Sequence, residues 1–347
     1  LDKNGQLYKV NYFEFHRDED VIKLADDPDY DQTKFEEKLE IKGDNDHTKL
    51  IAMLNALNDY SVPMSDILGK YFDTENLAYW MAFQLLTGNT DTQSRNMYLY
   101  SPTNSDTFYV LDWDNDGMLM RKEYEIKQRS DGKSWENGIS NYWGNMLFSR
   151  CLQTKSFRTA LDKAIQDEYK YMNANRINSM VKHYRSITEQ YVWKMPDSMY
   201  EGVTKSQYDV IANQLHSEIE QNYQTYQTGF NKPMPFYIGT PTPTNGKLKL
   251  SWDVSYDFND EDLRYTVTVS KDYAGNDVVF SQSDVVLPEA VMDMPGEGQY
   301  FIKVSVCNAS GYTQDAFDHY ITDGNKIYGT KCFYVKADGS IVEDANE

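Results

Sequence analysis

Hydrophobic residues change their spacing once along this chain, near residue 233. Before that point they recur at three- and four-residue intervals, the pattern of amphipathic helices. The segments with this spacing are 46–58, 74–87, 141–152, 157–172, 175–193 and 205–228. Thr74 is placed to cap the second of these helices and Gly88 to end it. The first part of the chain is therefore predicted to be rich in helix.

Three short segments of the first part have the composition of strands instead. Residues 7–13 form one of them, and residues 97–100 and 108–111 flank a Ser-Pro-Thr-Asn-Ser-Asp turn as a hairpin. The acidic stretch from Asp18 to Asp46 is expected to be mostly solvated surface. The first part thus combines helices with a small sheet.

After residue 233 apolar and polar residues alternate, most clearly in 247–252, 265–269 and 300–306. Alternation of this kind predicts strands with one buried face. A length of 347 residues also exceeds the roughly 250 residues at which a single core usually stops growing. We therefore predict an α+β protein with a helix-rich domain, 1–232, and an all-β sandwich, 233–347.

Composition excludes some classes of partner. The chain has 54 acidic and 34 basic residues and a formal net charge of −20, so it would repel nucleic acid. No apolar run reaches the ~18 residues that a membrane-spanning helix requires. Cys151, Cys307 and Cys332 cannot form a disulfide scaffold, and buried free thiols are expected.

An acidic cluster follows the predicted hairpin. Asp112, Asp114 and Asp116 alternate along it, and their mutual repulsion favours a bound cation. One interpretation is a Ca²⁺-binding EF-hand loop, because these residues and Glu123 occupy positions 1, 3, 5 and 12 of that motif. An EF-hand needs a helix before the loop, whereas the preceding residues favour a strand.

A second interpretation includes the polar loop upstream. Asp91 and Asn96 have the Asp-x4-Asn spacing of a kinase catalytic loop, and Asp114 follows after the hairpin. Phosphoryl transfer needs a carboxylate that orients the attacking hydroxyl, together with an amide and a carboxylate that hold Mg²⁺ on the phosphates. The alternative for Asp91 is a loop cap without chemistry, since Asp is common in turns.

These residues resemble the CotH kinases, a family of atypical secreted kinases named for a spore-coat protein. The resemblance rests on Tyr71-Phe72-Asp73-Thr74-Glu75-Asn76-Leu77, Asn89-x-Asp91-x4-Asn96-x-Tyr98-Leu99-Tyr100 and Trp113-Asp114-x-Asp116, and it extends over residues 1 to about 230. It implies an atypical kinase that uses Mg²⁺ and ATP to phosphorylate hydroxyls of surface or spore-coat proteins. Asp91 would be the catalytic carboxylate, Asn96 and Asp114 metal ligands, and Asp116 a second candidate ligand. The implied location is secreted or on a bacterial cell surface, with any signal peptide upstream of Leu1.

One part of the family pattern has no counterpart here. No G-x-G-x-x-G precedes Asp91, and the region that covers the nucleotide and carries its phosphate-binding lysine is not found upstream of that residue. We expect the chain by itself to bind ATP poorly. A different class of function stays open, in which the kinase-like domain is a degenerate scaffold in a cell-surface binding protein.

The last third of the chain resembles a fibronectin type III domain. The resemblance lies in Trp252, early in one predicted strand, and in Tyr300-x-Ile302-x-Val304-x-Val306 in a late one. It implies a spacer or binding module without chemistry of its own. Contact with carbohydrate or the cell surface is the role we expect for such a module.

Overall fold

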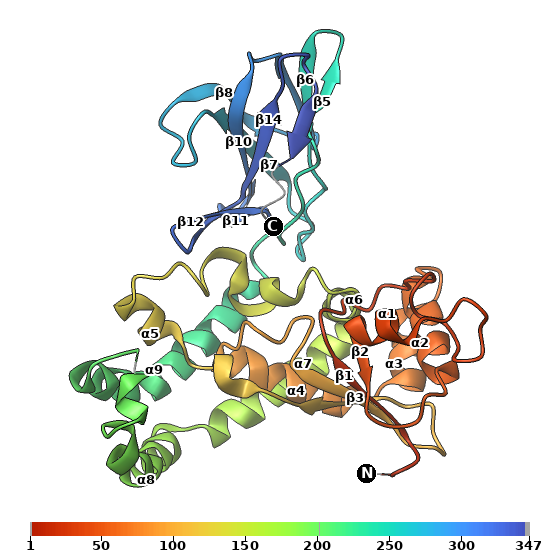
Figure 1. Cartoon of the computed structure of the whole chain (residues 1–347), viewed down its shortest axis with the longest axis vertical. Helices are drawn as coiled ribbons and strands as arrows, with labels where there is room; N and C mark the ends of the chain where they lie inside the picture. Colours follow the sequence, from red (N-terminus) through yellow and green to blue (C-terminus); the bar gives the residue numbers. More distant parts are fainter. Residues whose placement is uncertain (1, 201, 344–347) are drawn as a thin grey trace. The chain divides into compact units, whose positions relative to one another are not determined.

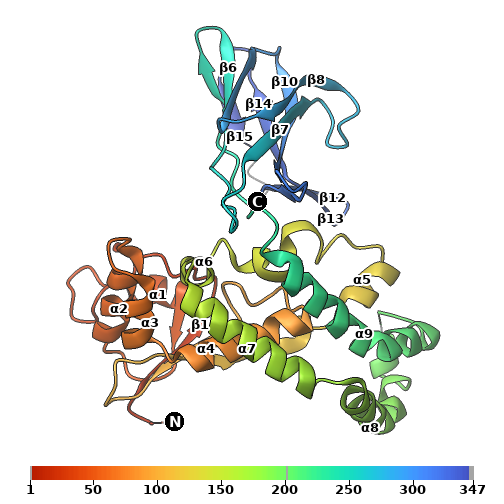
Figure 2. The ribbon, with the colours of Figure 1, turned by 180° about the vertical axis from the view of Figure 1, so that it is seen from behind.

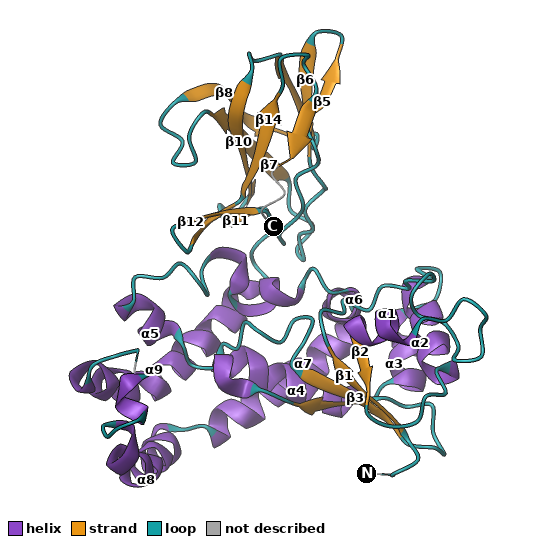
Figure 3. Ribbon diagram, in the orientation of Figure 1, coloured by secondary structure: helices purple, strands orange, loops and turns teal. Residues whose placement is uncertain are grey.

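The computed structural model describes residues 2–200 and 202–343, and its fold is α+β (Figures 1 and 3). The chain forms two compact units. The first contains Leu1–Ile126 and Asn141–Tyr226, and the second contains Lys127–Ser140 and Gln227–Glu347. The single boundary predicted at residue 233 differs from this division by a few residues and by the segment Lys127–Ser140, which returns to the first unit at Asn141.

The first unit contains a four-stranded antiparallel sheet with the order β2-β1-β3-β4. Its strands are β1 (Gln6–Val10), β2 (Leu39–Ile41), β3 (Met97–Ser101) and β4 (Tyr109–Asp112). The predicted hairpin is present as β3 and β4, and Asp112 at its end lies opposite Met97. The acidic cluster therefore begins where an edge strand ends.

Helices make up most of the first unit. They are α1 (Gln32–Lys38), α2 (Thr48–Asn58), α3 (Met64–Tyr71), α4 (Thr74–Thr87), α5 (Arg121–Ile126), α6 (Met146–Gln153), α7 (Lys155–Tyr171), α8 (Ala174–Val192) and α9 (Lys205–Gly229). Short 3-10 helices are η1 (Asn115–Gly117), η2 (Ser134–Glu136), η3 (Gly138–Tyr142) and η4 (Asp197–Met199). Figure 2 shows α7 lying along α4, and these two helices are in extensive contact.

Helix α4 is the central helix of the first unit. Asp73, not the predicted Thr74, caps it, because the Asp73 carboxylate accepts a hydrogen bond of 2.9 Å from the Asn76 N–H. Gly88 ends it in the left-handed conformation, as predicted. Trp80 is buried on this helix and stacks on Phe148 of α6 with 5.4 Å between ring centroids. Nine of its fourteen residues are buried, so α4 is enclosed on several sides.

One prediction about the first unit is confirmed and one is corrected. Most residues of the acidic stretch 18–46 are exposed, as predicted, although the stretch also contains α1 and β2 and buries Ile22, Phe35 and Leu39 completely. These apolar residues contribute to the core although their neighbours are charged. The helix predicted over 141–152 is interrupted, because the Asn145 side chain accepts hydrogen bonds from two backbone N–H groups and starts α6 at Met146.

The second unit consists mainly of antiparallel strands. They are β5 (Thr242–Thr244), β6 (Lys247–Ser251), β7 (Leu263–Ser270), β8 (Val278–Val285), β9 (Glu289–Asp293), β10 (Gly298–Asn308), β11 (Thr313–Asp315), β12 (His319–Thr322), β13 (Asn325–Tyr328), β14 (Thr330–Val335) and β15 (Ile341–Glu343). One sheet has the order β15-β14-β10-β7-β8 with β11 beside β10, another has the order β5-β6-β9, and β12 pairs with β13.

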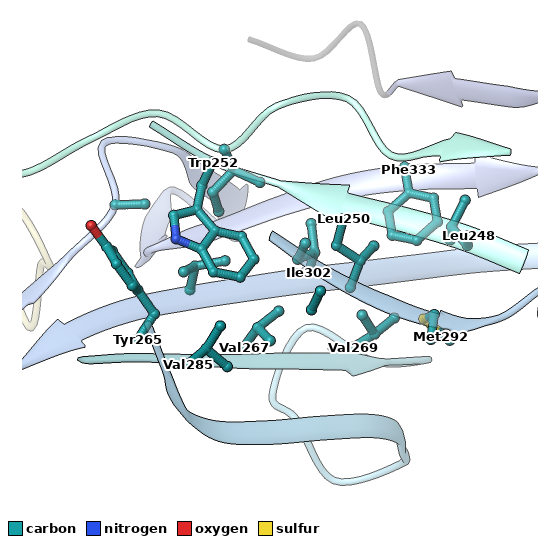
Figure 4. Packing of buried hydrophobic residues seen from close by; sticks show 14 of the residues in the cluster. Leu248, Leu250, Trp252, Tyr265, Val267, Val269, Val285, Met292, Ile302 and Phe333 are labelled. Carbon is teal, nitrogen blue, oxygen red and sulfur yellow. The ribbon is translucent and has the colours of Figure 1, made fainter. Parts of the chain in front are cut away.

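The two larger sheets share one core. Leu248 and Leu250 of β6 face Val267 and Val269 of β7 across it, and Trp252 packs near Tyr265 (Figure 4). Every second residue of these strands is buried, as the alternating pattern predicts. Cys307 and Cys332 are free thiols in β10 and β14, and Cys151 is a buried free thiol in α6.

The segment Lys127–Ser140 is built into the second unit. Trp135 packs its ring against Phe317 and Tyr328, at centroid distances of 5.3 and 5.9 Å. Glu136 is buried there, accepts a 2.8 Å hydrogen bond from the Tyr328 hydroxyl and pairs with Lys326. A buried carboxylate with several donors is stable only while all its partners stay in place.

Replacement of Gly88 by Ala should lower the free energy of unfolding by at least about 1 kcal/mol. Its φ of 62° disfavours a side chain, and a Cβ would lie 2.6 Å from Nδ2 of Asn222. Gly69 of α3 is the control, because a Cβ there meets nothing within 4 Å, so Gly69→Ala should stabilise the helix by ~0.5–1 kcal/mol. Urea unfolding of both variants measures this, and a similar sign for the two would contradict the assignment.

Candidate active site

Two polar loops of the first unit carry the residues predicted for catalysis and metal binding. The first loop, residues 88–96, joins α4 to β3, and the second, residues 112–119, follows β4. Because β3 and β4 are neighbours in the sheet, the two loops start from the same region of the fold. Sequence reasoning placed Asp91 and Asn96 in the first loop and Asp114 and Asp116 in the second.

The structure brings Asp91 and Asn96 together. Asn96 donates a 2.9 Å hydrogen bond from Nδ2 to Oδ2 of Asp91. The other carboxylate oxygen, Oδ1, accepts a 2.7 Å hydrogen bond from Nε of Arg95 and a second one from its Nη2. Asp91 is therefore oriented from both sides, while about a third of its side chain remains exposed.

Arg95 was not singled out from the sequence. Its guanidinium lies over the ring of Tyr12 at 4.9 Å and also donates to the Tyr12 hydroxyl. It is thus held between an aromatic ring and the carboxylate of Asp91, four residues before it. The spacing of Asp91 and Arg95 is the only signal in the sequence for this pair, and it is a common one.

Buried side chains hold the first loop from beneath. The Tyr142 hydroxyl donates to the carbonyl of Asn89 at 3.1 Å and lies 2.9 Å from Oγ1 of Thr92. Asn141 donates to the carbonyl of Thr90 at 3.2 Å, and Asn145 donates to that of Gln93 at 2.7 Å. The interior carbonyls of the loop are thereby satisfied, as buried backbone groups must be.

The second loop lies against the first at Gly117. A Cβ on Gly117 would be 2.8 Å from Oδ1 of Asn89 and 3.3 Å from Cβ of Asp91, so a side chain at this position would displace Asn89. Leu119 donates its N–H to the carbonyl of Thr87 at 2.8 Å. The second loop therefore approaches Asp91 closely at Gly117 and is fixed by a backbone hydrogen bond to the end of α4.

Asp114 and Asp116 are exposed residues on this second loop. Within residues 2–200 and 202–343, neither carboxylate has a hydrogen-bond or ion-pair partner. Asp114 has a positive φ of 55°, a conformation in which Asp is one of the few tolerated residues. Across the described chain, no group of three or more His, Cys, Asp or Glu residues is arranged to hold a metal ion.

Asp112 differs from the other two acidic residues. Its Oδ1 accepts a 2.8 Å hydrogen bond from Gln84 of α4, which is buried. Asp112 as a whole is exposed, but its carboxyl group contacts the helix, and partial burial raises the pKa of that group. The EF-hand interpretation, with Asp112, Asp114, Asp116 and Glu123 as ligands, therefore gains no support. A strand leads into the loop, and Glu123 lies in the first turn of α5.

Glu168 of α7 is a further titratable group near this loop. Burial raises the pKa of its carboxyl to about 8, and the charge of Asp112 adds to the rise. Its Oε2 atom is buried without a hydrogen-bond partner in the described residues. No sequence pattern marks this residue, because it stands among the ordinary polar positions of an amphipathic helix.

Tyr142→Phe should lower the stability of the protein by about 1–3 kcal/mol, because it leaves the carbonyl of Asn89 with only a long contact of 3.5 Å from the Thr92 hydroxyl. Amide hydrogen exchange in residues 89–93 should become faster. Tyr300→Phe is a matched control, since its hydroxyl donates to the carbonyl of Gly296 at 3.1 Å in the second unit. Faster exchange of residues 89–93 in both variants, or in neither, would show that Tyr142 does not hold the loop.

Glu168→Gln should stabilise the protein increasingly as the pH rises from about 5 to 8. The folded protein keeps a proton on Glu168 up to a pKa of about 8, whereas the unfolded chain loses it near 4.5. Stability from this group is therefore complete below pH ~4.5 and is lost as the pH approaches 8. Gln is always neutral and escapes this loss. Thermal unfolding across this pH range measures the difference.

Asp167 on the same helix is the control for that experiment. A hydrogen bond from Tyr79 and one from Lys163 lower its pKa, so its contribution is present above its unfolded pKa and is lost on acidification. Asp167→Asn should give no gain between pH 5 and 8. A gain in that variant, or none in Glu168→Gln, would contradict the protonated state of Glu168.

Comparison with known proteins adds a family to this geometry. No curated protein matches the sequence. Among solved structures, "Structure of surface layer protein SbsC, domains 1-6" is similar at 11% identity and a TM-score of 0.15, with 86% of this chain and 39% of that chain covered. The chain thus spans about two fifths of that protein, and so low a score carries no argument about fold. The family described as "CotH kinase protein" matches residues 1–226, well over half of the sequence. The chain belongs to the CotH kinase family.

Proposed function

We propose that this protein transfers a phosphoryl group from Mg²⁺-bound ATP to hydroxyl groups of proteins. The observation that carries the proposal is the pair formed by Asp91 and Asn96, which are five positions apart and hydrogen-bonded at 2.9 Å. They lie in a loop with its backbone fixed from beneath by Tyr142 and Asn145. Membership of the CotH kinase family supports a kinase-like function.

Asp91 is the proposed catalytic carboxylate. It is part-exposed, so a hydroxyl can approach it, and its two oxygens are oriented by Asn96 and Arg95. A carboxylate held in this way accepts the proton of an attacking hydroxyl and keeps that hydroxyl in line with the phosphate. Arg95 neutralises the charge of Asp91 and brings a cation close to the place where negative phosphate would bind.

The residues at the two loops suit Mg²⁺. Asn96 offers an amide oxygen, because its Nδ2 is the atom that binds Asp91, and Asp114 and Asp116 offer exposed carboxylates without other partners in the described chain. Mg²⁺ prefers oxygen ligands and usually takes only one or two carboxylates from the protein, with phosphates and water as the rest. The small number of protein ligands is therefore compatible with the ion. When bound with ATP, Mg²⁺ would offset the charge of the phosphates.

The second unit is proposed to be a fibronectin type III-like module. The order β8-β7-β10-β14 in one sheet and β5-β6-β9 in the other is that of such domains. The Tyr300 hydroxyl donates to the carbonyl of Gly296 four residues upstream, the contact of a tyrosine corner. A module of this type would present the kinase domain at a surface. The secreted or cell-surface location and the surface or spore-coat partners stay predictions.

No helix in the described residues is long and apolar enough to cross a membrane.

Asp91→Asn should reduce phosphoryl transfer by about 10²–10⁴-fold, because the amide cannot accept a proton. The assay uses the longest natural chain that contains this sequence, radiolabelled ATP and Mg²⁺, with autophosphorylation and a mixed protein acceptor as readouts. Asp106→Asn is the control, since Asp106 is an exposed residue in the β3–β4 turn. Transfer that survives Asp91→Asn at the wild-type rate would refute the proposed role.

Asp114→Asn should raise the Mg²⁺ concentration needed for half-maximal activity.

A further inference from the structure

An apolar groove of about 520 Å³ lies in the first unit beside the candidate active site. Its walls come from α4, the end of α7, α8, α9 and the residues that follow η1. Figures 1 and 2 show α8 and α9 at the end of this unit away from β1 and β2. The volume lies within the range of about 300–1,000 Å³ that binding sites usually have.

The groove adjoins the second loop of the candidate site. Met118 and Leu119 line it and directly follow Gly117, where an added Cβ would lie 3.3 Å from Cβ of Asp91. Thr87, at the end of α4, also lines the groove and accepts the hydrogen bond from Leu119. A polypeptide bound in the groove would therefore contact the loop that lies beside the proposed catalytic carboxylate, Asp91.

The groove is open, and much of its lining remains exposed. Met118, Met180 and Tyr184 are 37%, 45% and 58% exposed although they are large and apolar. Helix α8 buries none of its residues despite the amphipathic spacing of its sequence. A small apolar ligand usually loses most of its surface in a closed cavity. An open surface with flexible methionines is better suited to side chains of a longer polypeptide.

Charge in the groove is opposite to the charge of the chain. The lining includes Arg176 and Arg185 and no Asp or Glu, whereas the whole chain has a net charge of −20. Arg185 is paired with Glu189 and Asp209. Arg176 is exposed, lies over the ring of Tyr171 at 3.5 Å, and forms no ion pair within residues 2–200 and 202–343. One cation at the groove is thus available for a carboxylate.

We propose that this groove binds a segment of the protein substrate in which aliphatic side chains are accompanied by an acidic residue. The aliphatic side chains enter between α8 and α9, and the acidic residue pairs with Arg176. The segment is held with its hydroxyl-bearing neighbour directed along Met118 toward Asp91. The assignment of the occupant as a substrate rests on the proposed kinase function, whereas the binding site itself does not.

The binding experiment uses the intact chain without nucleotide. The probe is a fluorescein-labelled peptide with Leu at three- and four-residue spacing, Asp between the leucines and one Ser. Fluorescence anisotropy should show saturable binding, and the same peptide with Lys in place of Asp should bind more weakly. Met180→Glu should weaken binding of the Asp peptide by about tenfold or more, since it places a charge among the bound leucines.

Ile187→Glu provides the matched control. Ile187 lies on the same helix and is 45% exposed, as Met180 is, but it does not line the groove. Its replacement should leave the affinity within about twofold. Arg176→Glu should reverse the preference between the Asp and Lys peptides. Circular dichroism and thermal unfolding establish that the variants are folded.

Four results would overturn the groove as a peptide site. They are no saturable binding of the peptide, equal weakening by Met180→Glu and Ile187→Glu, no change of preference in Arg176→Glu, and saturable binding of decanoate instead of the peptide. The last result would identify a small amphiphile as the ligand. Whether the groove binds the substrate is tested separately in the phosphoryl-transfer assay. There, Met180→Glu should raise KM for the peptide and leave kcat unchanged. Binding that persists while Asp91-dependent transfer is absent would refute the kinase function and leave the groove in place.

Discussion

The hydrogen bonds that satisfy the interior carbonyls of the loop after α4 are the constraint on which the candidate site depends. A polar loop that turns into the core needs a donor for each buried carbonyl, or each unpaired group costs of the order of 1–3 kcal/mol. Tyr142, Asn141 and Asn145 provide these donors from one short stretch of chain. Asp91 can then stand at a fixed position on the outer side of the loop, where it remains accessible.

Helix α4 links this loop to every other part of the site. Its last residue, Thr87, receives the second loop through Leu119, and its buried Gln84 holds the carboxyl group of Asp112. The same end of the helix lines the apolar groove. A helix that is buried on several faces cannot shift without disturbing its neighbours. The loop of residues 88–96, the acidic loop of residues 112–119 and the groove therefore share one rigid support.

Much of this arrangement follows from patterns that are local in sequence. The helices α4, α7, α8 and α9, the hairpin and the alternating strands each have a period that a short window shows, and they appear close to the predicted positions. The Asp-x4-Asn spacing also identified Asp91 and Asn96 as a pair, because both residues lie in one short stretch of a single loop, and they are hydrogen-bonded. The coordination role of Asp114 and Asp116 has no comparable local test and stays a prediction.

Other features depend on contacts between distant residues and left no local signal. Arg95 meets Tyr12 across more than eighty positions, and the raised pKa of Glu168 depends on its burial on α7 and on Asp112. Phe35 and Leu39 are buried within an acidic stretch because a few apolar residues suffice to cover a sheet edge. Asp73 rather than Thr74 caps α4, and both residues are good caps, so sequence alone could not choose between them.

Because residues 127–140 pack within the second unit, that unit cannot be exchanged independently of the first. This segment lies within the part of the chain that the family match covers, yet Trp135 and Glu136 complete the interior of the following module. Exchange of that module for an unrelated one would leave an indole and a carboxylate without their sites. Both residues lie only a few positions before Asn141 and Tyr142, which hold the loop of residues 88–96. The two modules are therefore expected to be inherited as a pair.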